Sequence, residues 1–404
     1  MNTASYECYA QKLSSLTIFR DLLANPLLQQ LQTLLSACAA PEKGAEPLPA
    51  AYGAFTALLF RQGVNFSEAL LALVMENENP YLLAAAKGEA IPPQIQAAAE
   101  RELAFFTELS ALSSADLKQA MPKALADFLP DWENAPLDFS ALYATRIAEA
   151  PRKGYGLFAK YHVFTFDGKN LQPVSHPDPQ RLSQLSGYER EAGIVLRNTE
   201  ALLQGGTPSN LLLYGDAGTG KSSTIKAVAN ELWEQGLRLI EVKKNQLFHL
   251  PLLLEQLSDH PLKFILFIDD LSFTENDEHF ASLKAILEGS VTAFAKNTVI
   301  YATSNRRHLV KETMGERSGD DIHVNDTLQE MMSLSARFGL TITFQKPDKE
   351  GYLSIVSHLA QEYGLALPED ELFRKAEAFA IRQNGRSPRT AKHFVETELA
   401  KLSI

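Results

Sequence analysis

Two short motifs in the second half of the chain carry residue types that bind phosphates and can assist their hydrolysis. GDAGTGKSS, residues 215–223, matches the pattern G-x-x-x-x-G-K-[ST], in which glycines let backbone N–H groups face phosphate oxygens. FILFIDDLSF, residues 264–273, is an apolar run that ends on two adjacent carboxylates, Asp269 and Asp270. Two neighbouring acids at the end of a buried strand are costly unless a cation neutralises them or a reaction uses them.

The first motif predicts a role for each part of the loop. Lys221 is expected to reach the β- and γ-phosphates, Ser222 to ligate Mg²⁺, and the following helix to add a favourable dipole at its start. The cofactors predicted for this site are ATP and Mg²⁺. The residues predicted to contact the nucleotide are Gly215, Asp216, Ala217, Gly218, Thr219, Gly220, Lys221, Ser222 and Ser223.

The second motif predicts a metal ligand followed by a candidate catalytic acid. In P-loop proteins an apolar strand that ends in Asp helps to hold the Mg²⁺, and Asp269 occupies that position. The next acid is in many hydrolysing members a Glu that polarises the attacking water. Here it is Asp270, which is one methylene shorter. Asp270 either orients the water or caps the loop that follows.

A third signal closes a later apolar run. YATSNRR, residues 301–307, places polar side chains at the end of a strand, where one of them can hydrogen-bond the γ-phosphate or the water. Asn305 is the residue that we assign to this role, with Ser304 as the second candidate.

Alternating strands and helices must position these residues. Short β-rich runs at 211–214, 238–242, 264–268, 298–303 and 340–344 are separated by helical stretches, which predicts a five-stranded parallel sheet covered by helices on both faces. Residues 161–174 predict a β-hairpin that turns at Asp167-Gly168. The chain is helical before residue 150 and after 345. We expect an N-terminal all-α domain (1–150), an α/β nucleotide-binding domain (151–344) and a helical lid (345–404).

GDAGTGKSS, FILFIDD, ATSN, LSARFGLTITF and GRSPRTAKHF, in this order, resemble the AAA+ ATPases over roughly residues 155–404. The resemblance is greatest to bacterial AAA+ ATP-binding proteins catalogued as a domain of unknown function. It implies a three-layer αβα P-loop fold in which the Asn305 strand lies between the P-loop strand and the Asp269 strand. Lys221, Asp269 and Asn305 would then converge on one nucleotide.

The resemblance also implies roles for two arginines and for the residues around the base. LSARFGL resembles a box whose arginine reaches a neighbouring subunit's γ-phosphate, so Arg337 would act in trans. GRSPRTAKHF resembles the start of the lid helix that contacts the nucleotide, so Arg389 would bind from the lid, with Arg386 as the alternative. QRLSQLSGYERE resembles the segment around adenine, where Leu185 and Tyr188 would lie. An ion pair or core packing is the structural alternative for each of these side chains.

Composition and charge indicate the cellular location of the protein and the kind of partner that it binds. The net charge is −11 over 404 residues, and residues 1–150 hold 9 Lys and Arg against 17 Asp and Glu. Phosphate backbones are bound by Lys and Arg, so the N-terminal domain is expected to contact a protein partner rather than nucleic acid. Two cysteines, no apolar run of about 20 residues and no secretory signal pattern favour a cytoplasmic protein without a membrane segment.

Two functional hypotheses remain. The first is an ATPase that turns over ATP to ADP at the interfaces of a homo-oligomer, with a hexameric ring as the family default, and moves a partner. The second is a molecular switch or adaptor that binds ATP and hydrolyses it slowly or not at all, because signalling ATPases that act as switches also end this strand on two Asp residues. Residues 306–332, long and mixed in charge, are a lid, a partner contact or a solvated insertion.

Overall fold

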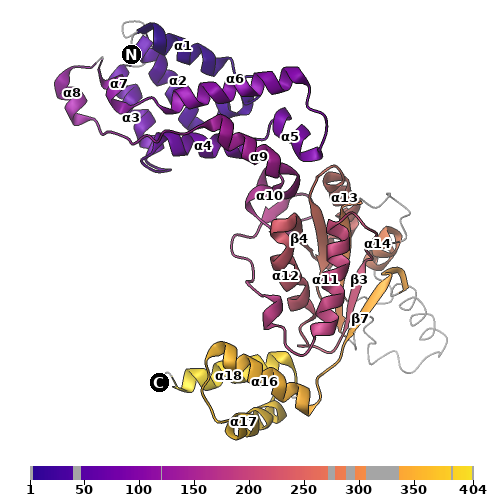
Figure 1. Ribbon diagram of the computed structural model, residues 1–404. Helices are drawn as coiled ribbons and strands as arrows, with labels where there is room; N and C mark the ends of the chain where they lie inside the picture. Colours follow the sequence, from indigo (N-terminus) through magenta and orange to yellow (C-terminus); the bar gives the residue numbers. More distant parts are fainter. Residues whose placement is uncertain are drawn as a thin grey trace. The chain divides into compact units, whose positions relative to one another are not determined.

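The chain divides into two compact units, Met1–Gly156 and Leu157–Ile404 (Figure 1). The computed structural model describes residues 3–39, 47–119, 121–271, 278–287, 296–305, 336–383 and 385–402. The predicted insertion, 306–332, lies outside these residues. Division of the second unit into an α/β part and a lid stays a prediction. No helix in the described ranges is both long and apolar enough to span a membrane.

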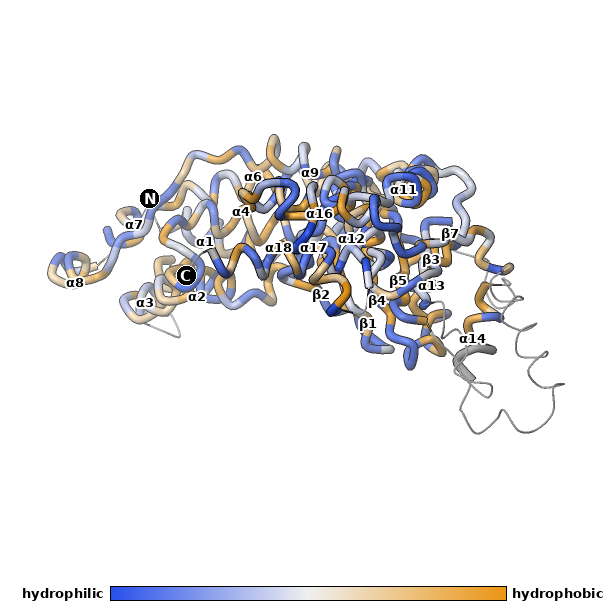
Figure 2. The backbone as a smooth tube through the Cα atoms, turned by 90° about the horizontal axis from the view of Figure 1, so that it is seen from below, coloured by the Kyte–Doolittle hydropathy of each residue, from blue (hydrophilic) through white to orange (hydrophobic). Residues whose placement is uncertain are grey.

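The first unit is all-helical and has its own apolar core. The core includes Leu31, Phe55, Phe66, Phe106 and Tyr143, each at most 1% exposed. Orange and blue alternate along its helices in Figure 2, as expected when one face of each helix is buried. Its helices are α1 (Thr3–Ser14), η1 (Arg20–Ala24), α2 (Pro26–Ala39), α3 (Leu48–Leu59), α4 (Phe66–Glu76), α5 (Pro80–Lys87), α6 (Pro93–Ser110), α7 (Ser114–Lys118), α8 (Lys123–Phe128) and α9 (Phe139–Lys153).

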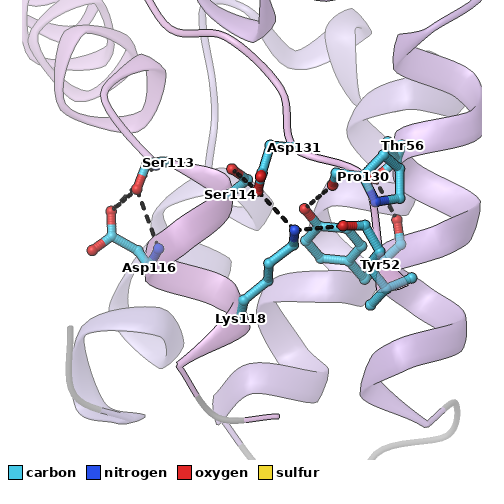
Figure 3. A network of polar contacts seen from close by, with 9 residues as sticks. Tyr52, Thr56, Ser113, Ser114, Asp116, Lys118, Pro130 and Asp131 are labelled. Atoms are coloured by element: carbon cyan, nitrogen blue, oxygen red, sulfur yellow. Dashed lines mark hydrogen bonds and ion pairs between the residues drawn. The ribbon is translucent and has the colours of Figure 1, made fainter. Parts of the chain in front are cut away.

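The half-buried Lys118 binds residues of the loop after α8 and contacts an aromatic ring of this core (Figure 3). The Lys118 ammonium donates to the Leu129 carbonyl at 2.6 Å and to Asp131 Oδ1 at 2.7 Å, and it lies 5.7 Å from the centre of the Tyr52 ring. Hydrogen bonds from Lys118 and Ser114 lower the pKa of the Asp131 carboxyl below its ordinary value of 3.8. Loop position therefore depends on this cation.

Lys118→Met should destabilise the first unit by about 1–3 kcal/mol, because charged hydrogen bonds of this kind contribute that much. A depressed carboxyl pKa stabilises the folded state above the unfolded pKa, and this stabilisation is lost as pH falls through the folded pKa. The difference between the wild type and the variant should therefore hold from neutral pH down to about 4 and shrink at lower pH. Urea unfolding of the full chain, followed by fluorescence of the buried Trp132, measures it.

Lys12→Met is the matched control for this prediction. Lys12 also pairs with a carboxylate, Glu108, and lies over an aromatic ring, but both members of its ion pair are about half exposed. Its loss should cost less than about 1 kcal/mol. Equal losses of unfolding free energy for the two variants would show that the burial of Lys118 adds nothing to stability.

The second unit is built around a seven-stranded sheet in the order β2-β1-β4-β5-β6-β3-β7. The strands are β1 (Val163–Phe166), β2 (Leu171–Pro173), β3 (Leu211–Gly215), β4 (Leu237–Val242), β5 (Lys263–Ile268), β6 (Thr298–Asn305) and β7 (Leu340–Phe344). The prediction that the Asn305 strand lies between the P-loop strand and the Asp269 strand is confirmed, because β6 pairs in parallel with both β3 and β5.

The predicted count of five strands is wrong. The hairpin at 161–174 forms as expected, with β1 antiparallel to β2, but β1 also pairs in parallel with β4 and extends the sheet. Phe164 and Phe166 are thereby buried on one face with the neighbouring strands. An edge strand with unpaired backbone groups accepts such an addition readily, which the hairpin sequence alone does not reveal.

Helices cover both faces of the sheet, as the three-layer prediction requires. Residues of α11 and α12 pack with Leu211, Leu213, Ile265 and Phe267 on one face, and residues of α13 and α14 pack with Leu212, Leu266 and Ile268 on the other. The helices of this unit are α10 (Leu157–Lys160), η2 (Leu182–Gln184), α11 (Glu189–Leu203), α12 (Lys221–Leu232), η3 (Trp233–Gln235), η4 (Lys244–His249), α13 (Leu250–Ser258), α14 (Glu278–Leu287), α16 (Lys349–Tyr363), α17 (Glu369–Arg382) and α18 (Pro388–Leu402).

The helices after β7 pack around a core of their own. Tyr352, Val356, Ala376 and Val395 are buried together between α16, α17 and α18. In Figure 1 these helices, orange to yellow, form a separate group after the last strand.

Candidate functional site

The loop between β3 and α12 has the backbone that its glycines predict. Gly215 has φ 149°, and a Cβ there would lie 1.9 Å from the Phe344 carbonyl oxygen of the neighbouring strand. Gly218 and Gly220 have φ of 77° and 90°, in the left-handed region that favours glycine. The loop thus wraps closely over the end of the sheet, and α12 begins directly at Lys221.

The Lys221 side chain is 7% exposed and is held by neutral oxygens. Its ammonium donates to the carbonyls of Gly215 and Asp216 at 3.0 and 2.7 Å and to Asn305 Oδ1 at 3.1 Å. Burial lowers its pKa, against the opposing influence of nearby carboxylates. A buried cation gains most from an anionic partner, and a phosphate would provide one.

Asp269 lies beside Ser222 at the carboxyl end of β5. Its Oδ1 accepts from the Ser222 hydroxyl at 2.6 Å, from the Thr303 hydroxyl at 2.5 Å and from the Asp270 N–H at 3.1 Å. Among the residues described, no hydrogen bond reaches Oδ2. The structure therefore brings the two predicted metal ligands together and leaves one carboxylate oxygen for a cation.

Oxygen ligands from one hydroxyl and one carboxylate fit Mg²⁺, which takes few protein ligands and relies on phosphates and waters for the rest. Within the described part of the chain no cluster of three or more His, Cys, Asp or Glu could hold a metal alone. Ser222 and Asp269 fit a Mg²⁺ that arrives with a triphosphate.

Asp270 has a backbone conformation that marks it out. Its φ of 52° is the only positive value at a non-glycine position in the described chain, and Asp and Asn are among the side chains that tolerate this region. Its N–H donates to the Thr303 hydroxyl at 2.9 Å, and its Oδ1 accepts from Asn305 Nδ2 at 2.8 Å. The carboxylate is exposed, so it can meet a water.

The polar side chains at the end of β6 point alternately to opposite faces of the sheet. Thr303 and Asn305 reach the two acids and Lys221, whereas the Ser304 hydroxyl donates to the Leu271 carbonyl at 2.7 Å and is 1% exposed. Ser304 therefore does not reach the site. Thr303 was missed from the sequence, although the period of two along a strand places it on the same face as Asn305.

These residues open into one pocket of about 650 Å³, a size typical of small-molecule sites. Leu185 and Tyr188, both predicted to border the base, line it. The Tyr188 ring stacks on Phe344 at 5.2 Å, and its hydroxyl donates to the Gln345 carbonyl at 2.6 Å. Helix α16 adds Ile355, Leu359 and Tyr363 to the lining, which the sequence analysis did not identify.

The predicted arginines differ in their placement. Arg389 lines the pocket, and its backbone N–H donates to the Gly218 carbonyl of the loop at 3.2 Å. Arg386 instead makes a two-pronged ion pair with Glu377 at 2.9 and 2.7 Å. Arg337 is half-buried just before β7 and does not line this pocket. A residue that contacts the nucleotide of a neighbouring copy does not have to line the pocket of its own copy.

A model of a known protein family matches most of this unit. The family model described as "Protein of unknown function (DUF815)" matches residues 159–402. The ORC1-type DNA replication protein of Methanocorpusculum labreanum is 36% identical over 87 residues, which are 20% of this chain and 19% of that protein.

Solved structures of Thermotoga maritima RuvB variants also match part of the chain. Two of them give TM-scores of 0.36 and 0.37 at 16% identity, cover 54% of this chain, and are themselves covered over 63% and 64%. The chain thus spans less than two thirds of the length of each of these relatives.

Proposed function

This chain belongs to the family described as "Protein of unknown function (DUF815)", and on that premise we propose that it is a nucleotide-binding protein of the AAA+ group. It would bind Mg·ATP and hydrolyse it to drive a conformational change on a partner. One observation carries the proposal. Lys221, Asp269, Asp270 and Asn305, from three separate segments, form one hydrogen-bonded set on the wall of a single pocket.

The roles follow from the chemistry of each side chain. Lys221 and the N–H groups at the start of α12 would hold the phosphates, while Ser222 and Asp269 would hold Mg²⁺. When bound, Mg²⁺ offsets the negative charge of the phosphates. Asn305 would fix both Lys221 and Asp270 through its carboxamide. We assign Arg389 to the phosphates from the side of the lid.

The reaction is water attack on the terminal phosphate. The water oxygen bonds to the γ-phosphorus, the bond to the oxygen that bridges the β- and γ-phosphates breaks, and ADP leaves. Asp270 accepts the proton that the water loses. Its exposed carboxylate and its strained backbone, held by Thr303 and Asn305, support this role.

A switch that binds ATP without fast turnover is the second candidate function. It is favoured by the contact between Asp270 Oδ1 and Asn305 Nδ2, which occupies one oxygen of a carboxylate that is already one methylene short. ATP would then act by stabilising one arrangement of the lid.

We propose that copies of the chain assemble around nucleotide and that Arg337 of one copy serves the pocket of the next. Particle mass measured with and without ATP, beside turnover, tests this proposal. Assembly that depends on ATP, together with turnover above that of the monomer, is the expected result. A tight ATP complex that stays monomeric with no turnover would support the switch and leave Arg337 without a trans role.

The first unit is proposed to contact a protein partner in the cytoplasm. Its helices carry the acidic excess of residues 1–150, which disfavours contact with phosphate backbones. Because one relative is named as a DNA replication protein, the turnover assay should be repeated with added duplex DNA, and no stimulation is expected.

A further inference from the structure

Two cations of helix α18 line the pocket. Arg389 and Lys392 lie three residues apart, so they share one face of the helix, and both are exposed and border the pocket. The sequence analysis gave a role to Arg389 alone. Lys392 has no part in the hydrogen-bonded set around Lys221.

The placement of this pair is unfavourable without an anion. Like charges at this spacing repel, and both lie within the first five residues of α18, where the positive end of the helix dipole disfavours cations. The first turn of α18 carries no acidic residue. Neither the Arg389 guanidinium nor the Lys392 ammonium makes a hydrogen bond or ion pair with any residue in the described ranges.

Three other cations of the same helical group pair with carboxylates. Arg386 pairs with Glu377, while Lys375 and Lys401 both pair with Glu398 at 3.2 and 2.6 Å. These three basic side chains away from the pocket thus have carboxylate partners, whereas Arg389 and Lys392 have none in the described ranges. Lys392 differs from other cations of these helices that have no ion pair among the residues described, such as Arg374 and Arg382, in that it borders the pocket.

We propose that Lys392 is a second phosphate ligand of the lid, so that α18 offers two cations to a nucleoside triphosphate. The inference rests on the proposed ATP site. Together with Lys221, which lines the same pocket, three positive charges would be available to the phosphates. Electrostatic attraction grows with the charge of the ligand, so Lys392 favours ATP over ADP and ADP over AMP.

The test compares nucleotide affinities of the full-length chain with Lys392→Gln and Lys392→Arg. Lys392→Gln should weaken Mg·ATP binding roughly five- to tenfold, weaken ADP binding less and leave AMP binding nearly unchanged. Lys392→Arg keeps the charge and should restore most of the ATP affinity. Lys401→Gln, on the same helix and paired outside the pocket, is the control and should change nothing. Calorimetric titration supplies each dissociation constant.

The outcomes separate this inference from the proposed function. If the wild type binds ATP and Lys392→Gln binds it equally well, Lys392 is a solvated lysine and the ATP site stands. An equal loss for ATP and AMP would show general damage to the pocket and would also overturn the inference. If the wild type binds no ATP, the proposed function itself fails.

Discussion

Lys221→Ala is expected to weaken Mg·ATP binding about 100-fold or more. The ammonium is buried and bonded only to carbonyl and carboxamide oxygens. Because none of these partners carries a charge, the ammonium can bind a phosphate without first breaking an ion pair. Loss of one charged hydrogen-bond donor costs about 1.5–3 kcal/mol, which is roughly 10- to 150-fold in affinity. The phosphates also lose the nearest fixed cation of the loop. Equilibrium titration with ATP in excess Mg²⁺ measures the effect.

Lys169→Ala is the matched control for this substitution. Lys169 is an exposed lysine at the β1–β2 turn in the same unit, where its backbone N–H bonds Asp167. Its removal should leave ATP affinity unchanged. Lys221→Ala also loses three hydrogen bonds to the loop and to Asn305, so its unfolding temperature is measured to show that the variant is folded at the temperature of the titration. Wild-type affinity in a folded Lys221→Ala protein would contradict the phosphate role.

Asp270→Asn should retain ATP binding and lower kcat roughly 100-fold or more, the usual contribution of a positioned general base. Asn has the same shape as Asp, and its carboxamide oxygen can still accept from Asn305 Nδ2. It cannot take the proton of the attacking water. Steady-state phosphate release at saturating ATP measures kcat, and titration confirms that binding persists.

The backbone conformation of Asp270 makes Asp270→Asn a more specific test of catalysis than Asp270→Ala, because Asp270→Asn should not change stability. Asn tolerates a φ of 52° nearly as well as Asp, whereas Ala pays for the left-handed conformation. Asp270→Ala should therefore unfold at a lower temperature, while Asp270→Asn should not. If Asp270→Asn hydrolyses ATP at the wild-type rate, Asp270 is a loop cap and not the general base.

The parts of the site that the sequence predicted are those fixed by local pattern. The P-loop is one continuous motif, and Asp269 and Asn305 each end an apolar run. Parallel strands bring their carboxyl ends to one edge, so these residues had to meet once the order of β5, β6 and β3 was known. That order came from the resemblance, and the structure confirms it.

The parts that the sequence missed depend on contacts between distant segments. β1 joins β4 across more than 60 residues, and nothing local in the hairpin indicates that pairing. Ile355 and Leu359 on α16 look like ordinary core residues of an amphipathic helix, yet they border the pocket as well. The left-handed backbone of Asp270 depends on Thr303 and Asn305, which lie more than 30 residues away.

A single-turnover experiment on the wild-type chain tests the central claim most directly. The full-length protein in excess over γ-labelled ATP, with Mg²⁺ present, should convert the bound ATP to ADP and release labelled phosphate in one exponential phase. Release should stop when Mg²⁺ is chelated. If the nucleotide is bound and later recovered as intact ATP, the pocket is a switch and not a hydrolase. If no ATP is bound at all, the account of Lys221, Asp269 and Asp270 is wrong.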